Sequence, residues 1–262
     1  MFKPGLLDVI SAAKDWRLPV LLATSDIRQR YRRSTLGPFW ITISCAVMIA
    51  CIGLIFGRLF KSPMSEFLPF IAAGLILWGF ISSVINEATS VFISSESIIK
   101  QLPIPLFSHV IRMVSRNLYI FFHNILIYPI VCLLVHKALG LNVFLVIPGL
   151  LLLFLNLLWI SLLIGVVCTR YRDMGQIVQS LLQIAFYVTP IIWMPNALNG
   201  RSSSLILDPN PVYHLMQLVR APLMNQQPTF LNWSFSLGLF LVGSLLTITI
   251  FNKYRYRIPY WL

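Results

Sequence analysis

The chain has 262 residues, of which 58% are hydrophobic and only 11% are charged, and its mean hydropathy is +0.81. A soluble domain is usually about 25% charged, so this chain carries too little charge to cover the surface of a soluble protein. We therefore expect an integral membrane protein. The net charge of +12 follows the flanks of the apolar stretches, which is typical of membrane topology signals, and no nucleic-acid partner is expected.

The N-terminal region, residues 1–37, precedes the first span. Its segment LLDVISAAKDW has the pattern of an amphipathic helix with Asp8 and Lys14 off the apolar face. The residues of that predicted apolar face are Leu6, Leu7, Ile10 and Ala13.

The segment SDIRQRYRRST turns Ile27 and Tyr31 toward one side among several arginines. A basic amphipathic helix lies in the membrane interface with its basic face toward anionic head groups. Gly37 and Pro38 would end this interfacial helix, because proline fits the first turn of the helix that follows. The alternative is that the arginines only enforce the orientation of the chain.

Six charge-free stretches have at least 20 residues each, enough for a helix to cross the hydrocarbon layer. They predict spans at 38–58, 67–86, 117–136, 142–168, 176–194 and 231–251. The apolar runs do not alternate, which argues against a transmembrane β-barrel. The first span carries small residues at helical spacing, and contact within the chain or with a second copy both remain open for its Gly53 and Gly57.

Lysine and arginine are unevenly divided between the two ends of these spans. With six spans, 15 of the 20 cationic residues fall on the side of the termini and five on the other side. The positive-inside rule therefore predicts that both termini are cytoplasmic. The domains predicted are a cytoplasmic N-terminal region (1–37), a six-span domain (38–252) and a cytoplasmic tail (253–262).

The loop predicted after the second span begins with polar residues and contains an amphipathic segment from Phe92 to Ile99. Pro103 and Pro105 stop that segment. A short helix lying across a cytoplasmic loop is typical of a docking element, and the alternative is an ordinary connecting loop.

Between spans five and six the chain is apolar but broken by prolines. Pro190 is expected to kink span five. The segment LILDPNPVYHLMQLVRAPLM predicts a re-entrant or interfacial helical hairpin, broken at 208–211 and at 221–222, because irregular backbone at membrane depth must be buried in protein or line water.

Motifs for several kinds of chemistry are missing. There is no phosphate-binding G-x-x-x-x-G-K-[ST] loop and no H-E-x-x-H, and the four histidines lie on separate elements, so no catalytic residue, metal site or bound cofactor is expected. The spans hold almost no ionisable residues, which disfavours an ion-coupled carrier. A separate ATPase subunit is then the expected energy source.

The spans do contain aromatic and amide side chains, which suit a sugar chain. The candidate glycan pathway consists of Trp78, Phe186, Tyr187 and Trp193. Aromatic residues at span ends also form the ordinary interfacial belt, and this alternative stays open.

The stretch SDIRQRYRRSTLGPFW resembles the N-terminal signature of ABC-2 polysaccharide-export permeases. The matching residues are Asp26, Arg30, Tyr31, Arg32, Ser34, Leu36, Gly37 and Trp40. NEATSVFISSESIIKQLPIPL and TRYRDMGQIVQ are similar to the cytoplasmic loops of that family, and YVTPIIW and NPVYHLMQLVRAPL to the end of its fifth span and its outer hairpin. The resemblance runs in order along nearly the whole chain.

This resemblance implies an all-α homodimeric permease in the bacterial inner membrane, with two copies of an ATPase subunit that binds ATP and Mg²⁺. The cargo would be a polysaccharide linked to undecaprenyl diphosphate, most often an O-antigen. The implied lipid-diphosphate residues of the interfacial helix are Arg28, Arg30, Tyr31, Arg32 and Arg33. The implied ATPase-docking residues are Ser94, Ser95, Glu96, Ile98, Lys100, Arg170, Arg172 and Asp173. The implied outer gate consists of Asn210, Pro211, Tyr213 and Arg220.

Three alternatives remain open from the sequence. The first is an exporter of capsule, teichoic acid or drugs from the same family. The second is an ATP-independent membrane enzyme that processes glycans, although the segment 195–230 offers few groups for catalysis. The third is an ion-coupled flippase, which the empty spans disfavour.

Overall fold

The computed structural model describes residues 4–32, 34, 36–37, 39–59, 62–138, 140–195 and 205–262. All regular secondary structure within these residues is helical, which confirms the predicted all-α class. Five helical segments are long and apolar enough to cross a membrane: Phe39–Leu59, Met64–Ala88, Leu106–Leu134, Leu141–Arg170 and Phe230–Trp261. The chain is therefore a multi-pass membrane protein.

The elements follow one another along the chain in a simple order. The first half contains α1 (Pro4–Lys14), α2 (Arg17–Arg30), α3 (Phe39–Leu59), α4 (Met64–Ala88), η1 (Ile93–Ser95), α5 (Glu96–Gln101), α6 (Leu106–Asn124) and α7 (Ile127–Leu134). The second half contains η2 (Leu141–Leu145), α8 (Val146–Arg170), α9 (Met174–Val188), α11 (Pro211–Leu223), α12 (Phe230–Tyr254), η4 (Arg255–Arg257) and α13 (Ile258–Trp261).

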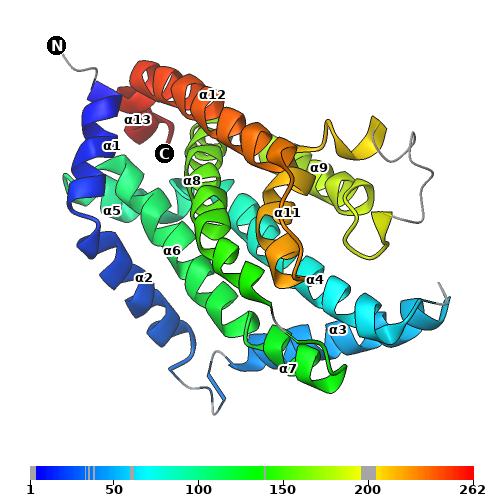
Figure 1. Ribbon diagram of the computed structural model, residues 1–262. Coiled ribbons are helices and arrows are strands. Elements are labelled where there is room, and N and C mark those ends of the chain that lie inside the picture. The colour runs from blue at the N-terminus through cyan, green and yellow to red at the C-terminus, as the bar shows by residue number, and fades with distance from the viewer. Residues whose placement is uncertain are drawn as a thin grey trace.

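Helix α4 forms the centre of the bundle. Two thirds of its apolar window is buried (67%), against 11% for that of α3. It packs on α3, α6, α7, α8, α9 and α11, and Figure 1 shows it passing between these helices. The core of the protein is thus built around one apolar helix, while α3 leaves most of its surface uncovered by this chain.

Helix α3 packs on α4 through its two glycines. A Cβ on Gly53 would lie 2.4 Å from Leu68 Cδ1, and one on Gly57 would lie 2.6 Å from Met64 Sδ. Small residues at this spacing let two helices approach closely. The G-x-x-x-G motif of the first span therefore makes a contact within the chain.

The N-terminal helices α1 and α2 lie along the outside of the bundle, where α2 runs beside α6 (Figure 1). The sequence placed Asp8 off the apolar face but did not indicate which side of α1 is buried. Its buried residues are Gly5, Asp8 and Ala12, whereas Leu7 and Ile10 are exposed. Asp8 turns inward because it has partners there, and the apolar side chains face outward, as suits a helix at a lipid interface.

Two predicted span boundaries also need correction. Helix α6 begins at Leu106, so residues 106–116, which include Arg112 and Arg116, are helical rather than part of a loop. Helix α9 ends at Val188, so Pro190 follows the helix and does not kink it. With 15 residues, α9 is shorter than the five candidate spans, and the predicted six-span count is not confirmed.

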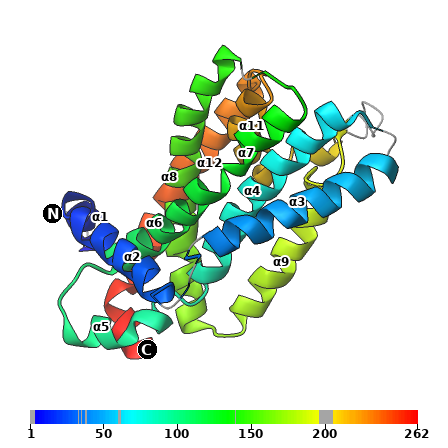
Figure 2. The same cartoon turned by 90° about the horizontal axis from the view of Figure 1, so that it is seen from below.

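Both termini lie at the same end of the bundle (Figure 2). Helices α1, α5 and α13 gather at that end, whereas α7 and α11 lie at the opposite end. We call these the terminal end and the far end. Helix α9 runs from the terminal end toward the far end, and α12 returns (Figure 2).

Candidate translocation groove and docking elements

A groove of about 610 Å³ runs between α4 and α9, with Met48 of α3 at its edge. From α4 it receives Trp78, Ser82 and Asn86, which are four residues apart and therefore share one helical face. From α9 it receives residues at the same kind of spacing, namely Gln179, Leu182, Gln183, Phe186 and Tyr187. The groove thus combines aromatic rings with amide groups along two neighbouring helices.

Aromatic contacts hold the predicted pathway residues together. The ring centroids of Trp78 and Phe186 are 5.6 Å apart, and those of Phe186 and Tyr187 are 5.4 Å apart. Trp193 lies beyond α9 and donates from Nε1 to the carbonyl oxygen of Tyr187 at 3.1 Å. Three of these four residues line the groove. Their role in carrying a glycan remains a prediction.

Other aromatic and amide groups of the spans have structural partners instead. Asn156 is fully buried, donates to the carbonyl oxygens of Leu152 and Ser236, and accepts from Trp159. Tyr128 donates to the carbonyl oxygen of Leu223 at 2.7 Å. These side chains fix α8 against α12 and α7 against α11 and do not line the groove.

The predicted docking segment forms a short helix at the terminal end. η1 and α5 cover Ile93–Gln101, and the chain turns away at Leu102 before the prolines, as predicted. Val91 and Phe92 are buried and anchor the segment against Gly165 of α8, where an added Cβ would lie 2.7 Å from Val91. Of the residues proposed to dock a partner, Glu96 and Lys100 form an exposed ion pair of 2.6 Å.

The remaining docking candidates differ in their exposure and contacts. Arg172 and Asp173 are exposed in the turn between α8 and α9. Arg170 instead lies over the rings of Tyr171, Tyr254 and Trp261 at 5.1, 5.8 and 5.3 Å. It therefore holds the C-terminal helix α13 in place, and α13 in turn packs on α5. Ser94 is exposed, while Ser95 and Ile98 are half-buried.

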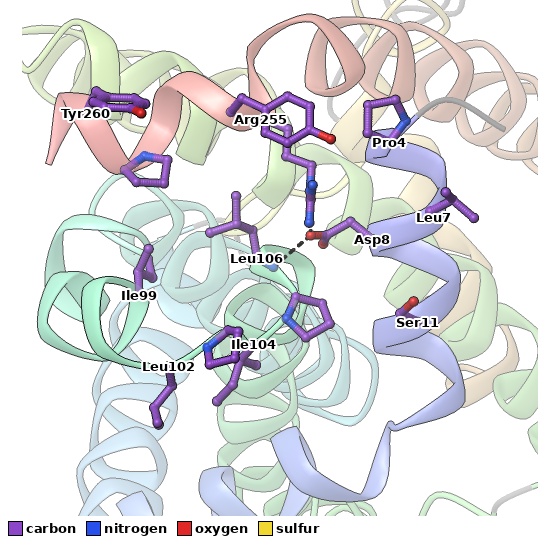
Figure 3. A pocket seen from close by; sticks show the side chains of 14 residues that line it. Pro4, Leu7, Asp8, Ser11, Ile99, Leu102, Ile104, Leu106, Arg255 and Tyr260 are labelled. Carbon is purple, nitrogen blue, oxygen red and sulfur yellow. Dashed lines mark hydrogen bonds and ion pairs between the residues drawn. The ribbon is translucent and has the colours of Figure 1, made fainter. Parts of the chain in front are cut away.

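Asp8 is a junction that the sequence reading missed. Its side chain is fully buried, and its carboxylate accepts from the backbone N–H groups of Leu106 and Phe107 at 3.1 and 3.0 Å. It also accepts from Arg255 Nε at 2.8 Å. Figure 3 shows this carboxylate between α1, the start of α6 and the C-terminal segment, on the wall of a cavity of about 620 Å³. One carboxylate thus caps α6 directly after the docking segment and links it to both ends of the chain.

The interfacial helix α2 is held to α6 by charged groups. Asp26 accepts from Arg112 Nε at 2.8 Å and from Arg116 at 3.1 Å, and Arg116 also pairs with Glu87 at 2.6 Å. Burial acts to raise the pKa of Asp26, but the hydrogen bonds and charges of Arg112 and Arg116 outweigh it and hold the pKa below its ordinary value of 3.8.

The arginines predicted to meet a lipid diphosphate are mostly exposed. Arg28, Arg30 and Arg32 face outward and Tyr31 is half-buried, while Arg33 lies outside the described residues. Arg30 lines a cavity of about 340 Å³ together with Glu87, His109, Arg112 and Arg116. His109 is buried, and its Nε2 has no hydrogen-bond partner among the described residues. Arg112 and Arg116 are four residues apart in the sequence. This spacing could have indicated that both lie on one face of a helix.

The predicted outer-gate residues all belong to the start and body of α11 at the far end. The Asn210 side-chain oxygen accepts from the N–H groups of Val212 and Tyr213, and its amide donates to Thr189 Oγ1 at 3.0 Å. Pro211 occupies the first turn, as expected for this residue. The helix continues through Pro222 to Leu223, so the predicted break at 221–222 falls within its last turn. The described residues do not confirm a re-entrant hairpin.

The family model of the ABC-2 type transporter matches residues 20–224. The chain belongs to this family.

The ABC-2 chain is also similar to curated relatives over nearly its whole length. Two proteins of Klebsiella pneumoniae, each described as an O-antigen export system permease protein RfbA, are 23% identical to it over 260 and 258 residues, which cover 92% of this chain and 93% of each relative. A Myxococcus xanthus protein of the same description is 22% identical over 205 residues, covering 78% of this chain and 79% of that protein. ABC-2 proteins are transporter subunits, so the resemblance stated from the sequence is confirmed.

Proposed function

We propose that this ABC-2 chain is the permease subunit of an exporter for a lipid-linked polysaccharide, most specifically an O-antigen on undecaprenyl diphosphate. The observation that carries the proposal is the groove between α4 and α9, where Trp78 and Phe186 stand beside Gln179 and Gln183. Aromatic rings stack on sugar faces and amides exchange hydrogen bonds with hydroxyl groups. The names of the Klebsiella and Myxococcus relatives support the choice of cargo.

The cavity below α2 is the proposed capture site for the lipid diphosphate. Arg30, Arg112 and Arg116 line it from two helices, and arginine suits a diphosphate because its planar fork binds two oxygens at once. The N–H or lone pair of His109 Nε2 is available for a further hydrogen bond. Of the described members of the predicted basic cluster, Arg30 lines this cavity, and α6 supplies Arg112 and Arg116.

The energy would come from a separate ATPase, with two copies serving a permease dimer. In this proposal α5 and the 170–173 turn are the docking elements. A movement of α5 would be transmitted to α1 and to the C-terminal segment, because Asp8 bonds both Leu106, which follows α5, and Arg255. Helix α9 and the residues after it complete a sixth crossing, and both termini are cytoplasmic in the inner membrane, as the lysine and arginine distribution indicates. The α11 segment then forms the outer gate.

Deletion of the gene tests this proposal. We expect full-length lipid-linked glycan to accumulate inside the cell and to disappear from the surface, and the wild-type gene to restore export. Chemical analysis of the accumulated glycan separates O-antigen from capsule and teichoic acid. Accumulation of short or unprocessed glycan, with lipid-linked intermediates still reaching the outer face, would contradict a permease and favour the glycan-processing enzyme.

A further inference from the structure

Arg220 at the far end carries a buried positive charge that no carboxylate of this chain neutralises. The residue is 1% exposed. Its Nε donates to Gln217 Oε1 at 3.3 Å and its Nη1 to the carbonyl oxygen of Pro190, whereas its Nη2 has no acceptor among the described residues. All eight acidic residues of the sequence fall within the described ranges, and none forms an ion pair with Arg220.

An unpaired buried cation is costly. Removing a charge from water is unfavourable unless a counter-charge and hydrogen bonds replace the lost hydration. The ring of Phe70 lies 4.4 Å from the guanidinium carbon, and such a cation–π contact replaces only part of that hydration. Two neutral oxygen acceptors and one ring leave part of the cost uncompensated, so the site favours an anion.

A cavity of about 260 Å³ adjoins this guanidinium, and we call it the Arg220 cavity. Lys137 also lines it, and its Nζ donates a weak hydrogen bond to Met224 Sδ at 3.9 Å. Glu66 is the one acid of the lining and is exposed. Among the described residues of the lining, two cations therefore face one carboxylate that pairs with neither. The cavity volume is several times the roughly 30 Å³ share of a water molecule.

We propose that the Arg220 cavity binds a phosphate oxyanion. Guanidinium binds phosphate through two parallel N–H groups, and an ammonium adds a point charge. The amide groups of Gln217 and Gln226, which line the same cavity, supply further donors. A phospholipid head group and free phosphate offer the same kind of oxygens to a guanidinium, so the phosphate comes either from a head group or from solution. The bound anion would link Arg220 of α11 to Lys137, which follows α7.

The proposal is independent of the exported cargo and can be tested on the purified full chain. The protein is stripped of lipid in detergent, and its unfolding temperature is followed against inorganic phosphate at constant ionic strength, with chloride as the reference anion. A parallel series uses dihexanoyl phosphatidylglycerol, with dihexanoyl glycerol as the neutral control. We expect at least one phosphate compound to stabilise the protein saturably.

Charge variants show whether the effect arises at this cavity. Lys137→Gln should weaken the binding of the active compound about tenfold, and Glu66→Gln should strengthen it, because each changes one charge near the anion. Lys14→Gln, an exposed residue of α1 at the other end, should leave it unchanged. Neither Lys137 nor Glu66 is a core residue, so these variants keep the test valid even if Arg220→Gln does not fold.

The results distinguish the source of the phosphate. Saturable binding of inorganic phosphate assigns the cavity to a free anion, and binding of the phosphatidylglycerol alone assigns it to a head group; both support the proposal. No saturable response to either compound overturns it. A saturable response that neither Lys137→Gln nor Glu66→Gln changes also overturns the proposal.

Discussion

Replacing Asp8 by alanine removes a buried carboxylate that accepts three hydrogen bonds from two distant parts of the chain. The two N–H groups at the start of α6 lose their partner, and each unsatisfied buried group costs about 1–3 kcal/mol. Arg255 is 28% exposed, so water replaces part of what it loses. We expect the free energy of unfolding to fall by about 3–5 kcal/mol, as when one partner of a buried pair is removed.

Arg255→Gln is the matched partner variant. It leaves Asp8 bonded to both N–H groups but removes the counter-charge of this carboxylate, and its effect should be smaller than that of Asp8→Ala, about 1.5–3 kcal/mol. In the Asp8→Ala background it should cost less than in the wild type, because the two residues interact directly.

The measurement is reversible unfolding in mixed micelles, followed by helix content. Asp15→Ala is the control: Asp15 is exposed just after α1, and its replacement should change the free energy by no more than about 0.5 kcal/mol. Equal effects of Asp8→Ala and Asp15→Ala would refute the reasoning, and so would additive effects in the double mutant.

Three further changes test other contacts. Gly149→Ala should cost about 1–3 kcal/mol of unfolding free energy, because the new Cβ would lie 2.3 Å from a backbone carbonyl oxygen of α11; Gly238→Ala, with no atom within 4 Å, should be neutral or stabilising. Asp26→Asn should destabilise at neutral pH. This difference from wild type should hold above pH 3.8 and shrink as the pH falls through the lowered pKa of Asp26. Trp78→Ala should reduce glycan export roughly threefold to tenfold, and the exposed Phe144→Ala should not.

Each of these has a contrary result. Equal stability of Gly149→Ala and Gly238→Ala would mean that α8 and α11 can separate without cost. A difference between wild type and Asp26→Asn that stays constant to low pH, measured by unfolding, would mean that the pKa of Asp26 is the same in the folded and unfolded states. Normal surface glycan in a strain whose Trp78→Ala protein is correctly inserted in the membrane would show that Trp78 is not part of the glycan pathway.

The sequence predicted features that follow from composition and local signals. Apolar length identified the membrane helices, and prolines marked the end of the docking segment at Gln101 and the start of α11 at Pro211. The α4 and α9 faces that meet in the groove were partly foreseen, because aromatic and amide residues stood out in otherwise aliphatic spans.

Features that depend on distant partners were not predicted. The burial of Asp8 was not predicted, because its partners lie 98 and 247 residues further along the chain. Arg112 and Arg116 were predicted to lie in a loop, because the third span was predicted to begin only after the last charged residue. In the structure they lie on α6, where ion pairs with Asp26 and Glu87 stabilise them. Pro190 was predicted to kink the fifth span, because nothing in the local sequence pattern showed that α9 ends at Val188.

The most direct test of the central proposal is transport in vesicles. The chain would be co-expressed with the neighbouring open reading frames, and the complex that co-purifies would be reconstituted with a fluorescent oligosaccharide linked to a polyprenyl diphosphate. The account predicts a stoichiometric complex and ATP-dependent movement of the lipid-linked sugar across the bilayer, lost with a hydrolysis-deficient ATPase and reduced by Trp78→Ala. A chain that purifies without an ATPase, or a complex that hydrolyses ATP while the sugar stays on its original side, would contradict the account.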